Sequence, residues 1–202
     1  MNIAEKILRL KQDMDDLYNA NQGSSTDEWF DKYQTLGEAR AYTYAFGYAC
    51  WDDSIYFPVR EINFDKGLSY TTSVGAFRQS FITDTKVPII CTKSGQGGYV
   101  FQGSKIVTIH KLVVSESTNY DNWFNNADRL ENITFEGTIG NSISFPHSPL
   151  TKASITHIVE HLSSTKTGLT ATFNKASKES AFTENEWITL KATKSNWTIQ
   201  VA

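Results

Sequence analysis

Phe77-Arg-Gln-Ser-Phe-Ile82, Phe101-Gln-Gly-Ser-Lys-Ile106 and Phe124-Asn-Asn-Ala-Asp-Arg-Leu130 share one pattern of apolar residues. Their last residues, Ile82, Ile106 and Leu130, are spaced 24 residues apart. A period of about 20 to 29 residues that returns apolar residues to equivalent places is typical of leucine-rich-repeat and similar solenoids. Each unit of a solenoid supplies a short strand and a turn, and is stabilised by stacking on its neighbours. The pattern therefore predicts a short solenoid, an architecture that mainly serves as a binding surface.

The composition limits the classes of function. The chain has 202 residues and a formal net charge of −3, which gives no basic footprint for nucleic acid. Its N-terminus is too polar for a signal peptide, and no stretch approaches the ~20 apolar residues that a membrane span needs. Cys50 and Cys91 are isolated in the sequence. A disulfide between them stays open, although two buried thiols are the expected state in a reducing cytosol.

The N-terminal segment, residues 1–35, has a different periodicity. Its apolar residues are spaced alternately four and three apart, as in a heptad seam: Ile3, Ile7, Leu10, Met14 and Leu17. Isoleucine at both early core positions favours more than two strands, so we expect a coiled coil that forms a homotrimer. The alternative is an amphipathic helix that packs on its own domain, because the seam is short for an independent coiled coil.

Residues 36–76 are dense in aromatic side chains. Tyr42, Tyr44, Phe46 and Tyr48 would share one face of an extended strand. Aromatic rings with nearby carboxylates, such as Trp51, Asp52 and Tyr56, could bind sugars, since rings stack on pyranose faces and carboxylates accept from hydroxyls. The simpler interpretation, which we favour, is a capping layer that seals one end of the solenoid.

Residues 150–202 predict an α/β unit that caps the other end. Ile155, Ile158, Val159 and Leu162 form the apolar stripe of a helix over 150–162. A strand is expected over 169–173, a second helix over 184–192 and a last strand over 197–201. Strands that alternate with helices at these lengths indicate crossovers in a parallel sheet.

The second half of the chain resembles a known family. The residues that carry the resemblance are Leu130-Glu-Asn-Ile-Thr-Phe-Glu-Gly-Thr-Ile-Gly140, Ile143-Ser-Phe145, Ser148-Pro-Leu-Thr-Lys-Ala-Ser-Ile155, and Trp187 followed by Ala192-Thr-Lys-Ser-Asn-Trp-Thr-Ile199. They are similar to leucine-rich-repeat proteins of the Listeria–Bacteroides type, found among the tail and host-interaction proteins of phages and prophages of gut bacteria. This copy departs from the family in having few repeats and no regular Asn or Cys ladder. The resemblance implies a tail-associated setting and brings no catalytic residues.

One motif invites an enzymatic interpretation. His157-Ile-Val-Glu160-His161 matches H-x-x-E-H, in which two histidines on one helical face bind zinc and the glutamate acts as base. That chemistry also needs a third ligand and a cleft, and the inward face of this helix is already apolar. Asp52 and Asp53 are adjacent, so on a strand they would point to opposite faces, unlike a catalytic pair. We expect no enzyme, no metal and no cofactor.

Together these patterns predict a mainly β protein with α elements. It would comprise an N-terminal coiled-coil helix (1–35), an aromatic-rich capping region (36–76), a short irregular leucine-rich-repeat-like solenoid (77–149) and an α/β C-terminal cap (150–202). The expected function is a phage tail-tip or fibre-associated protein, made in the bacterial cytoplasm and carried in the virion, that binds a bacterial surface glycan or protein. The expected contacts are aromatic residues and a carboxylate in turn-like contexts: Trp51, Asp52, Tyr56, Tyr99, Tyr120 and Trp123. The alternative is a structural tail or baseplate adaptor that joins other tail proteins and binds no receptor itself.

Overall fold

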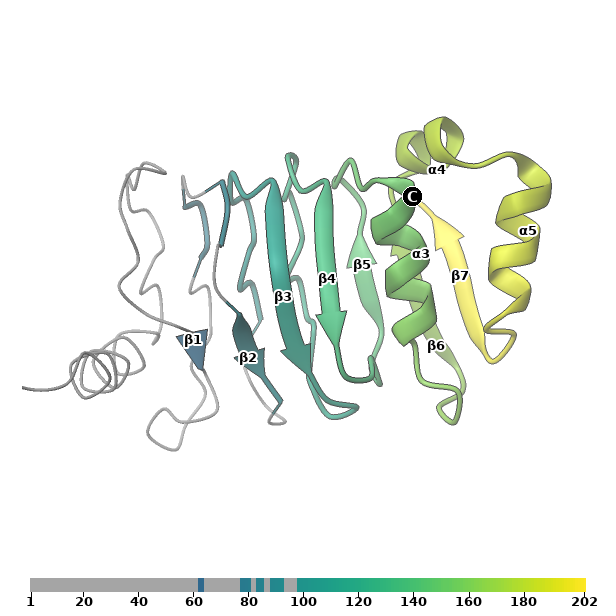
Figure 1. Ribbon diagram of the computed structural model, residues 1–202, viewed down its shortest axis with the longest axis horizontal. Coiled ribbons are helices and arrows are strands. Elements are labelled where there is room, and N and C mark those ends of the chain that lie inside the picture. The colour runs from purple at the N-terminus through teal and green to yellow at the C-terminus, as the bar shows by residue number, and fades with distance from the viewer. Residues whose placement is uncertain (1–61, 64–76, 81–82, 86–87, 93–97) are drawn as a thin grey trace, which may run out of the picture.

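The structure, a computed structural model, describes residues 62–63, 77–80, 83–85, 88–92 and 98–202 (Figure 1). Within these ranges the elements follow in the order β1 (Ile62–Asn63), β2 (Ile89–Cys91), β3 (Thr108–Val114), β4 (Asn132–Glu136), β5 (Ile143–Phe145), α3 (Lys152–His161), β6 (Leu169–Phe173), α4 (Lys175–Ala181), α5 (Glu184–Ala192) and β7 (Trp197–Val201). The heptad seam (Ile3, Ile7, Leu10, Met14, Leu17) and, apart from β1, the aromatic segment 36–76 lie outside the described residues. The predictions made for them stay predictions.

The first sheet has four parallel strands in the order β1-β2-β3-β4. Its register aligns Ile89 of β2 with Leu112 of β3, and Leu112 with Phe135 of β4. All three side chains are buried. Side chains of β4 alternate between buried and exposed, as expected for a strand with one face on the core and one face in water. The sheet therefore has an inner face that forms the core and an outer face that is open to solvent.

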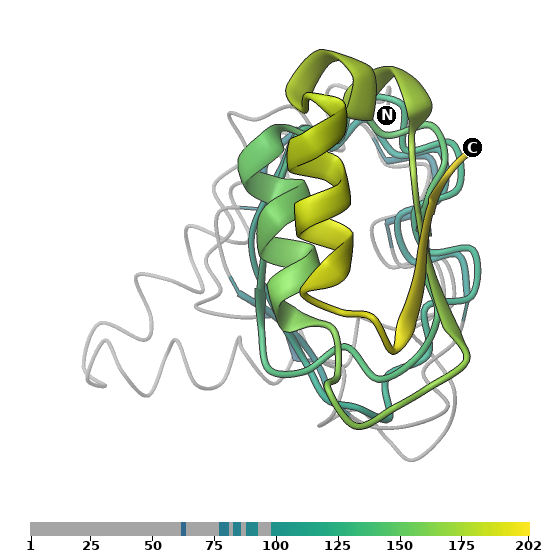
Figure 2. The same cartoon turned by 90° about the vertical axis from the view of Figure 1, so that its right-hand side faces the viewer.

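The second sheet has three parallel strands in the order β5-β6-β7. Parallel neighbours need a crossover, and here α3 connects β5 to β6 while α4 and α5 connect β6 to β7. Figure 2 shows the two layers end-on, with β6 and β7 on one side and α3 and α5 on the other. Helix α3 lies beside β4, so it extends the layer of the first sheet.

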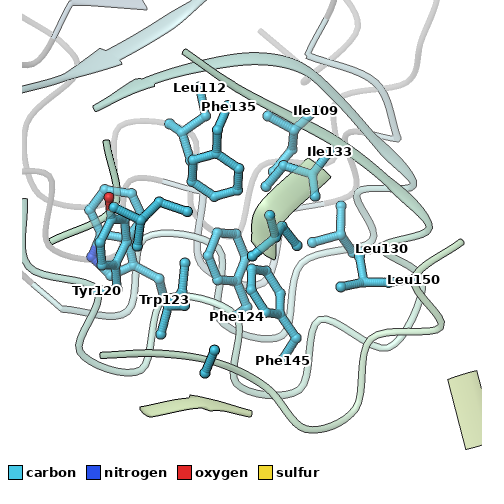
Figure 3. Packing of buried hydrophobic residues seen from close by; sticks show 14 of the residues in the cluster. Ile109, Leu112, Tyr120, Trp123, Phe124, Leu130, Ile133, Phe135, Phe145 and Leu150 are labelled. Atoms are coloured by element: carbon cyan, nitrogen blue, oxygen red, sulfur yellow. The ribbon is translucent and has the colours of Figure 1, made fainter. Parts of the chain in front are cut away.

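A column of stacked rings runs through the core between the layers. The ring centroids are 5.2 Å apart for Phe77–Phe101, 5.5 Å for Phe101–Phe124, 4.4 Å for Phe124–Phe145 and 6.0 Å for Phe145–Phe173. Figure 3 shows Phe124 and Phe145 side by side within this core. Each such ring buries a large apolar area, and stacked pairs contribute about 0.5–1.5 kcal/mol beyond that burial. The column joins the parts of the chain that carry the two sheets.

The predicted fold class is wrong. We expected a mainly β, leucine-rich-repeat-like solenoid over 77–149, whereas the described residues form an α/β arrangement of two parallel sheets and three helices. Phe77, Phe101 and Phe124 do stack, but they lie in turns and in neither sheet. Even spacing of apolar residues indicates that their side chains stack. It does not show whether they lie in strands, helices or turns. The interval from Phe145 to Phe173 is longer because α3 lies between the strands that hold these two rings.

The C-terminal elements lie where the sequence predicted them. Helices α3 and α5 and strands β6 and β7 match the predicted segments to within two residues at their ends. Helix α4 was missed, because Lys175-Ala-Ser-Lys-Glu-Ser-Ala181 has no apolar stripe and buries only Ser177. The boundary proposed at 149/150 separates β5 from its partner β6 within one sheet. The role of residues 150–202 as a cap stays a prediction.

Candidate binding surfaces

Two of the predicted contact residues belong to the core. Tyr120 is 3 % exposed and Trp123 is fully buried, and their rings pack edge-to-face with centroids 5.3 Å apart (Figure 3). Burial raises the pKa of the Tyr120 hydroxyl well above its ordinary value. Neither ring can reach a ligand on the surface, so the prediction of contacts at Tyr120 and Trp123 is corrected. Trp51, Asp52 and Tyr56 lie outside the described residues.

Tyr99 is the predicted contact that the structure places on the surface. Its side chain is 39 % exposed, the largest exposure of any aromatic residue that the structure describes. The Arg78 guanidinium carbon lies 5.5 Å from the centroid of the Tyr99 ring, within the range of a cation–π contact. On the next turn of the chain Asp121 and Asn122 are both exposed. We call these four residues, Arg78, Tyr99, Asp121 and Asn122, the Tyr99 corner.

The backbone of the Tyr99 corner is held in place by its neighbour in the stack. The Tyr99 amide donates to the Asp121 carbonyl at 2.9 Å, and the Asn119 side-chain amide donates to the Asp121 carboxylate at 2.9 Å. A Cβ on Gly98 would lie 2.8 Å from the same Asp121 carbonyl, so only glycine permits this approach. These contacts fix the positions of the ring and the carboxylate relative to each other.

Tyr99 also has a left-handed backbone, with φ of 70°. This conformation costs a residue with a Cβ about 1–2 kcal/mol. Asn122, in the next turn, has φ of 55°, but asparagine adopts this region with less strain. A bulky exposed residue in a strained conformation is more often found at functional sites than elsewhere. Tyr99 and Asn122 thus share the left-handed backbone of neighbouring turns, and the strain is greater at Tyr99.

A second exposed surface is the outer face of the first sheet, where β3 contains a bulge. Ile109 pairs with Ile133 and Leu112 pairs with Phe135, so His110 and Lys111 together lie opposite Thr134. The bulge directs two consecutive side chains to the outer face, whereas regular strand residues alternate. Bulges are over-represented at sites where a strand must re-aim a side chain.

Both bulge residues are paired with carboxylates from neighbouring segments. His110 Nε2 lies 3.0 Å from an oxygen of Asp84, and the Lys111 ammonium bonds the Glu136 carboxylate. All four side chains are between about one-third and three-fifths exposed, so these pairs contribute little to stability. We define the outer face by its exposed and half-buried polar residues: Asp84, Thr108, His110, Lys111, Asn132, Thr134 and Glu136. It carries charges of both signs in close alternation.

The H-x-x-E-H segment seals the edge of the first sheet. Among the described strands none pairs with the far side of β4, and α3 occupies that place. Ser154 Oγ accepts from the Ile133 amide at 3.1 Å and donates to the Glu131 carbonyl at 3.0 Å. His157 Nε2 lies 2.9 Å from the Phe135 amide nitrogen, and His161 Nδ1 donates to the His157 carbonyl at 2.9 Å. The polar side of α3 thus satisfies backbone groups that an exposed edge would leave open.

These hydrogen bonds give both histidines of the motif a structural role. His157 uses one ring nitrogen on the β4 backbone, and His161 uses one on its own helix. Among the residues that the structure describes, no group of three or more His, Cys, Asp or Glu side chains could hold a metal ion. The sequence contained a signal for this role, since Ser154 and His157 are three residues apart on one helical face and follow a strand.

Comparisons with protein-family models, with curated proteins and with solved structures found no match. Among the described residues, no helix is long and apolar enough to cross a membrane.

Proposed function

We propose that this chain is a phage tail-associated protein that binds carbohydrate on a bacterial surface through the Tyr99 corner. The resemblance described above supports the setting. The observation that carries the proposal is the Tyr99 ring, which is exposed, strained in its backbone and held against Arg78. Burial of Tyr120 and Trp123 removes two of the other predicted contacts, so recognition by the described residues centres on this ring.

The chemistry of the corner fits a sugar. An aromatic face stacks on the apolar face of a pyranose, while the Asp121 carboxylate and the Asn122 amide can accept from or donate to ring hydroxyls. A single shallow site of this kind binds weakly. An oligomer held by the heptad seam of residues 1–35 would present several copies, and linked weak sites can gain a factor of roughly 10² to 10⁴ in avidity.

The test is the binding of fluorescently labelled full chain to a panel of gut bacterial cells and their wall polysaccharides. Tyr99→Gly removes the ring and also relieves the left-handed strain, because glycine adopts φ of 70° without cost. We expect Tyr99→Gly to weaken binding about tenfold or more while the fold stays intact, as is usual for a central aromatic contact. Tyr99→Trp should retain binding.

The matched control is Tyr120→Phe, which changes a buried tyrosine and leaves the surface as it is. It should bind like the unmodified chain. Equal binding by Tyr99→Gly and the unmodified chain would refute the proposed site, and binding lost in Tyr120→Phe as well would show that the assay reports folding.

A second candidate, the structural adaptor, is favoured by the outer face. Its alternating charges and the bulge at His110 and Lys111 suit a protein partner with complementary charges. An adaptor should ignore cells and polysaccharide, and should co-purify with a neighbouring tail protein. Lys111→Glu should then abolish co-purification, whereas Lys166→Glu, the same charge change on an exposed loop, should not.

A further inference from the structure

We propose that the hydrogen bond between α3 and the edge of β4 depends on pH, and that protonation of His157 switches it from the Phe135 amide to the Phe135 carbonyl. The proposal concerns the contact between α3 and β4, and it does not depend on whether the Tyr99 corner binds sugar. It rests on the position of one ring nitrogen. His157 Nε2 lies 2.9 Å from the Phe135 amide nitrogen and 3.0 Å from the Phe135 carbonyl oxygen.

A single ring nitrogen can serve only one of these two groups at a time. With the ring neutral and its hydrogen on Nδ1, Nε2 has a lone pair and accepts from the Phe135 amide. When the ring gains a proton, Nε2 carries a hydrogen and can only donate, so it bonds the Phe135 carbonyl instead. The amide then faces an N–H group and loses its acceptor. One proton therefore exchanges one backbone hydrogen bond for another at the sheet edge.

The other contacts of α3 do not change with this proton. The Ser154 hydroxyl bonds the Glu131 carbonyl and the Ile133 amide, and it stays neutral between pH 5 and pH 8. His161 Nδ1 donates to the His157 carbonyl, a bond that both the neutral and the charged ring can make. The switch is therefore local to the second half of the helix.

The charged groups around His157 leave it without a counter-ion. The two imidazole centroids are 4.1 Å apart, so a second proton on His161 would add a like charge. On α3 itself, Glu160 is exposed. The carboxylate on β4, that of Glu136, is paired with Lys111. On α5, Glu186 is paired with Lys152, at the far end of α3. On α4, Lys178 is paired with Glu184. Within the described residues neither imidazole forms an ion pair, so the charge on a protonated His157 meets only the Phe135 carbonyl.

The test follows the isotope-labelled full chain by NMR between pH 8 and pH 5. Nitrogen shifts of the histidine rings report which nitrogen of His157 carries hydrogen, and hydrogen exchange corrected for its intrinsic pH dependence reports protection of the Phe135 amide. We expect hydrogen on Nδ1 at pH 8. As His157 takes up its proton, we expect protection of the Phe135 amide to fall roughly fivefold, the effect of one lost hydrogen bond.

Two variants separate the switch from general acid effects. His157→Gln supplies an amide oxygen that can accept from Phe135 at every pH, so the pH dependence of Phe135 protection should disappear. His147→Gln makes the same change at an exposed histidine and should leave the pH dependence unchanged. Hydrogen on Nε2 of His157 at pH 8, or unchanged Phe135 protection while His157 titrates, would overturn the proposal. Both readings come from the unmodified chain, so they do not depend on the variants folding.

Discussion

At the residue scale, backbone positions that need glycine fix how closely neighbouring turns approach. Gly137 follows β4 with φ of 96°, and a Cβ there would lie 2.1 Å from the Val114 carbonyl oxygen at the end of β3. No side chain fits at that distance. Gly168 has φ of 72°, but a Cβ there would meet no atom within 4 Å. A side chain at Gly137 would therefore meet both backbone strain and a steric clash, whereas a side chain at Gly168 would meet backbone strain alone.

Gly137→Ala should lower the free energy of unfolding by about 2 kcal/mol or more, because both the strain and the clash act on it. Gly168→Ala should cost about 1 kcal/mol, from the left-handed conformation alone. Urea denaturation of the two variants checks the difference. Equal losses would mean that the turns after β3 and β4 relax freely.

Residue-scale predictions from the sequence met with mixed success. Tyr99 was predicted to be a surface contact and is exposed, whereas Tyr120 and Trp123 were assigned the same role and are buried. All three follow polar or glycine-rich residues, so local context could not separate them. What separates them is the stacking of turns, which brings Tyr120 and Trp123 against Phe101, Phe124 and Phe135. That packing joins residues far apart in the sequence.

At the element scale, α5 begins with a capping box that also bonds α3. Thr183 Oγ accepts from the Glu186 amide, and the Glu186 carboxylate accepts from the Thr183 amide at 2.8 Å. The same carboxylate accepts from Lys152 at the start of α3 at 2.7 Å. The bond from Lys152, followed by the bonds from Thr183, lowers the pKa of Glu186 to about 2. The two helices are thereby joined at their first turns.

Glu186→Gln should remove a pH dependence of stability. Because the folded-state pKa lies below the ordinary value of about 4.3, the ionised carboxylate stabilises the fold fully above that value. The contribution is lost as the pH falls from there through about 2. Thermal unfolding between pH 2 and 6 should show that the unmodified chain is more stable than Glu186→Gln at pH 6. This difference in stability should shrink as the pH falls.

The matched control for that prediction is Glu179→Gln. Glu179 is an exposed residue of α4 whose carboxylate lies 3.8 Å from the Lys175 ammonium. The same shrinking difference in both variants would mean that it reflects net charge and not the bonds at Glu186.

The sequence predicted most of the C-terminal elements because their signals are local. Thr151 and Thr183 cap α3 and α5, and an apolar stripe follows Thr151, whereas α5 buries only Trp187. The same local signals could not identify the fold class, because helices and strands can both follow a stacked ring. Nor could they show that the H-x-x-E-H segment bonds β4, since this depends on where α3 lies beside the sheet.

At the scale of the whole molecule, the ring column makes one core of the described residues. Buried apolar residues from Phe77 to Ile199 form a single cluster, which crosses the boundary predicted at 149/150. Phe124 is fully buried and stacks on Phe101 towards one end of the chain and on Phe145 towards the other. A core of this kind should unfold as one unit.

Phe124→Ala should therefore destabilise both sheets together, by about 3–5 kcal/mol. Hydrogen exchange should speed up in β3 and in β6 by similar factors. Faster exchange in β3 with β6 unchanged would instead support two independent domains divided near residue 150.

The central claim is that the Tyr99 corner binds carbohydrate from a bacterial surface. The most direct measurement is the change in NMR chemical shifts of the isotope-labelled full chain when wall polysaccharide fragments are added. The proposal predicts that, among the described residues, the largest changes lie at Tyr99, Asp121 and Asn122, and that they disappear in Tyr99→Gly. Shift changes confined to the outer face around His110 and Lys111 would contradict the proposal. So would the absence of shift changes with every polysaccharide fragment tested.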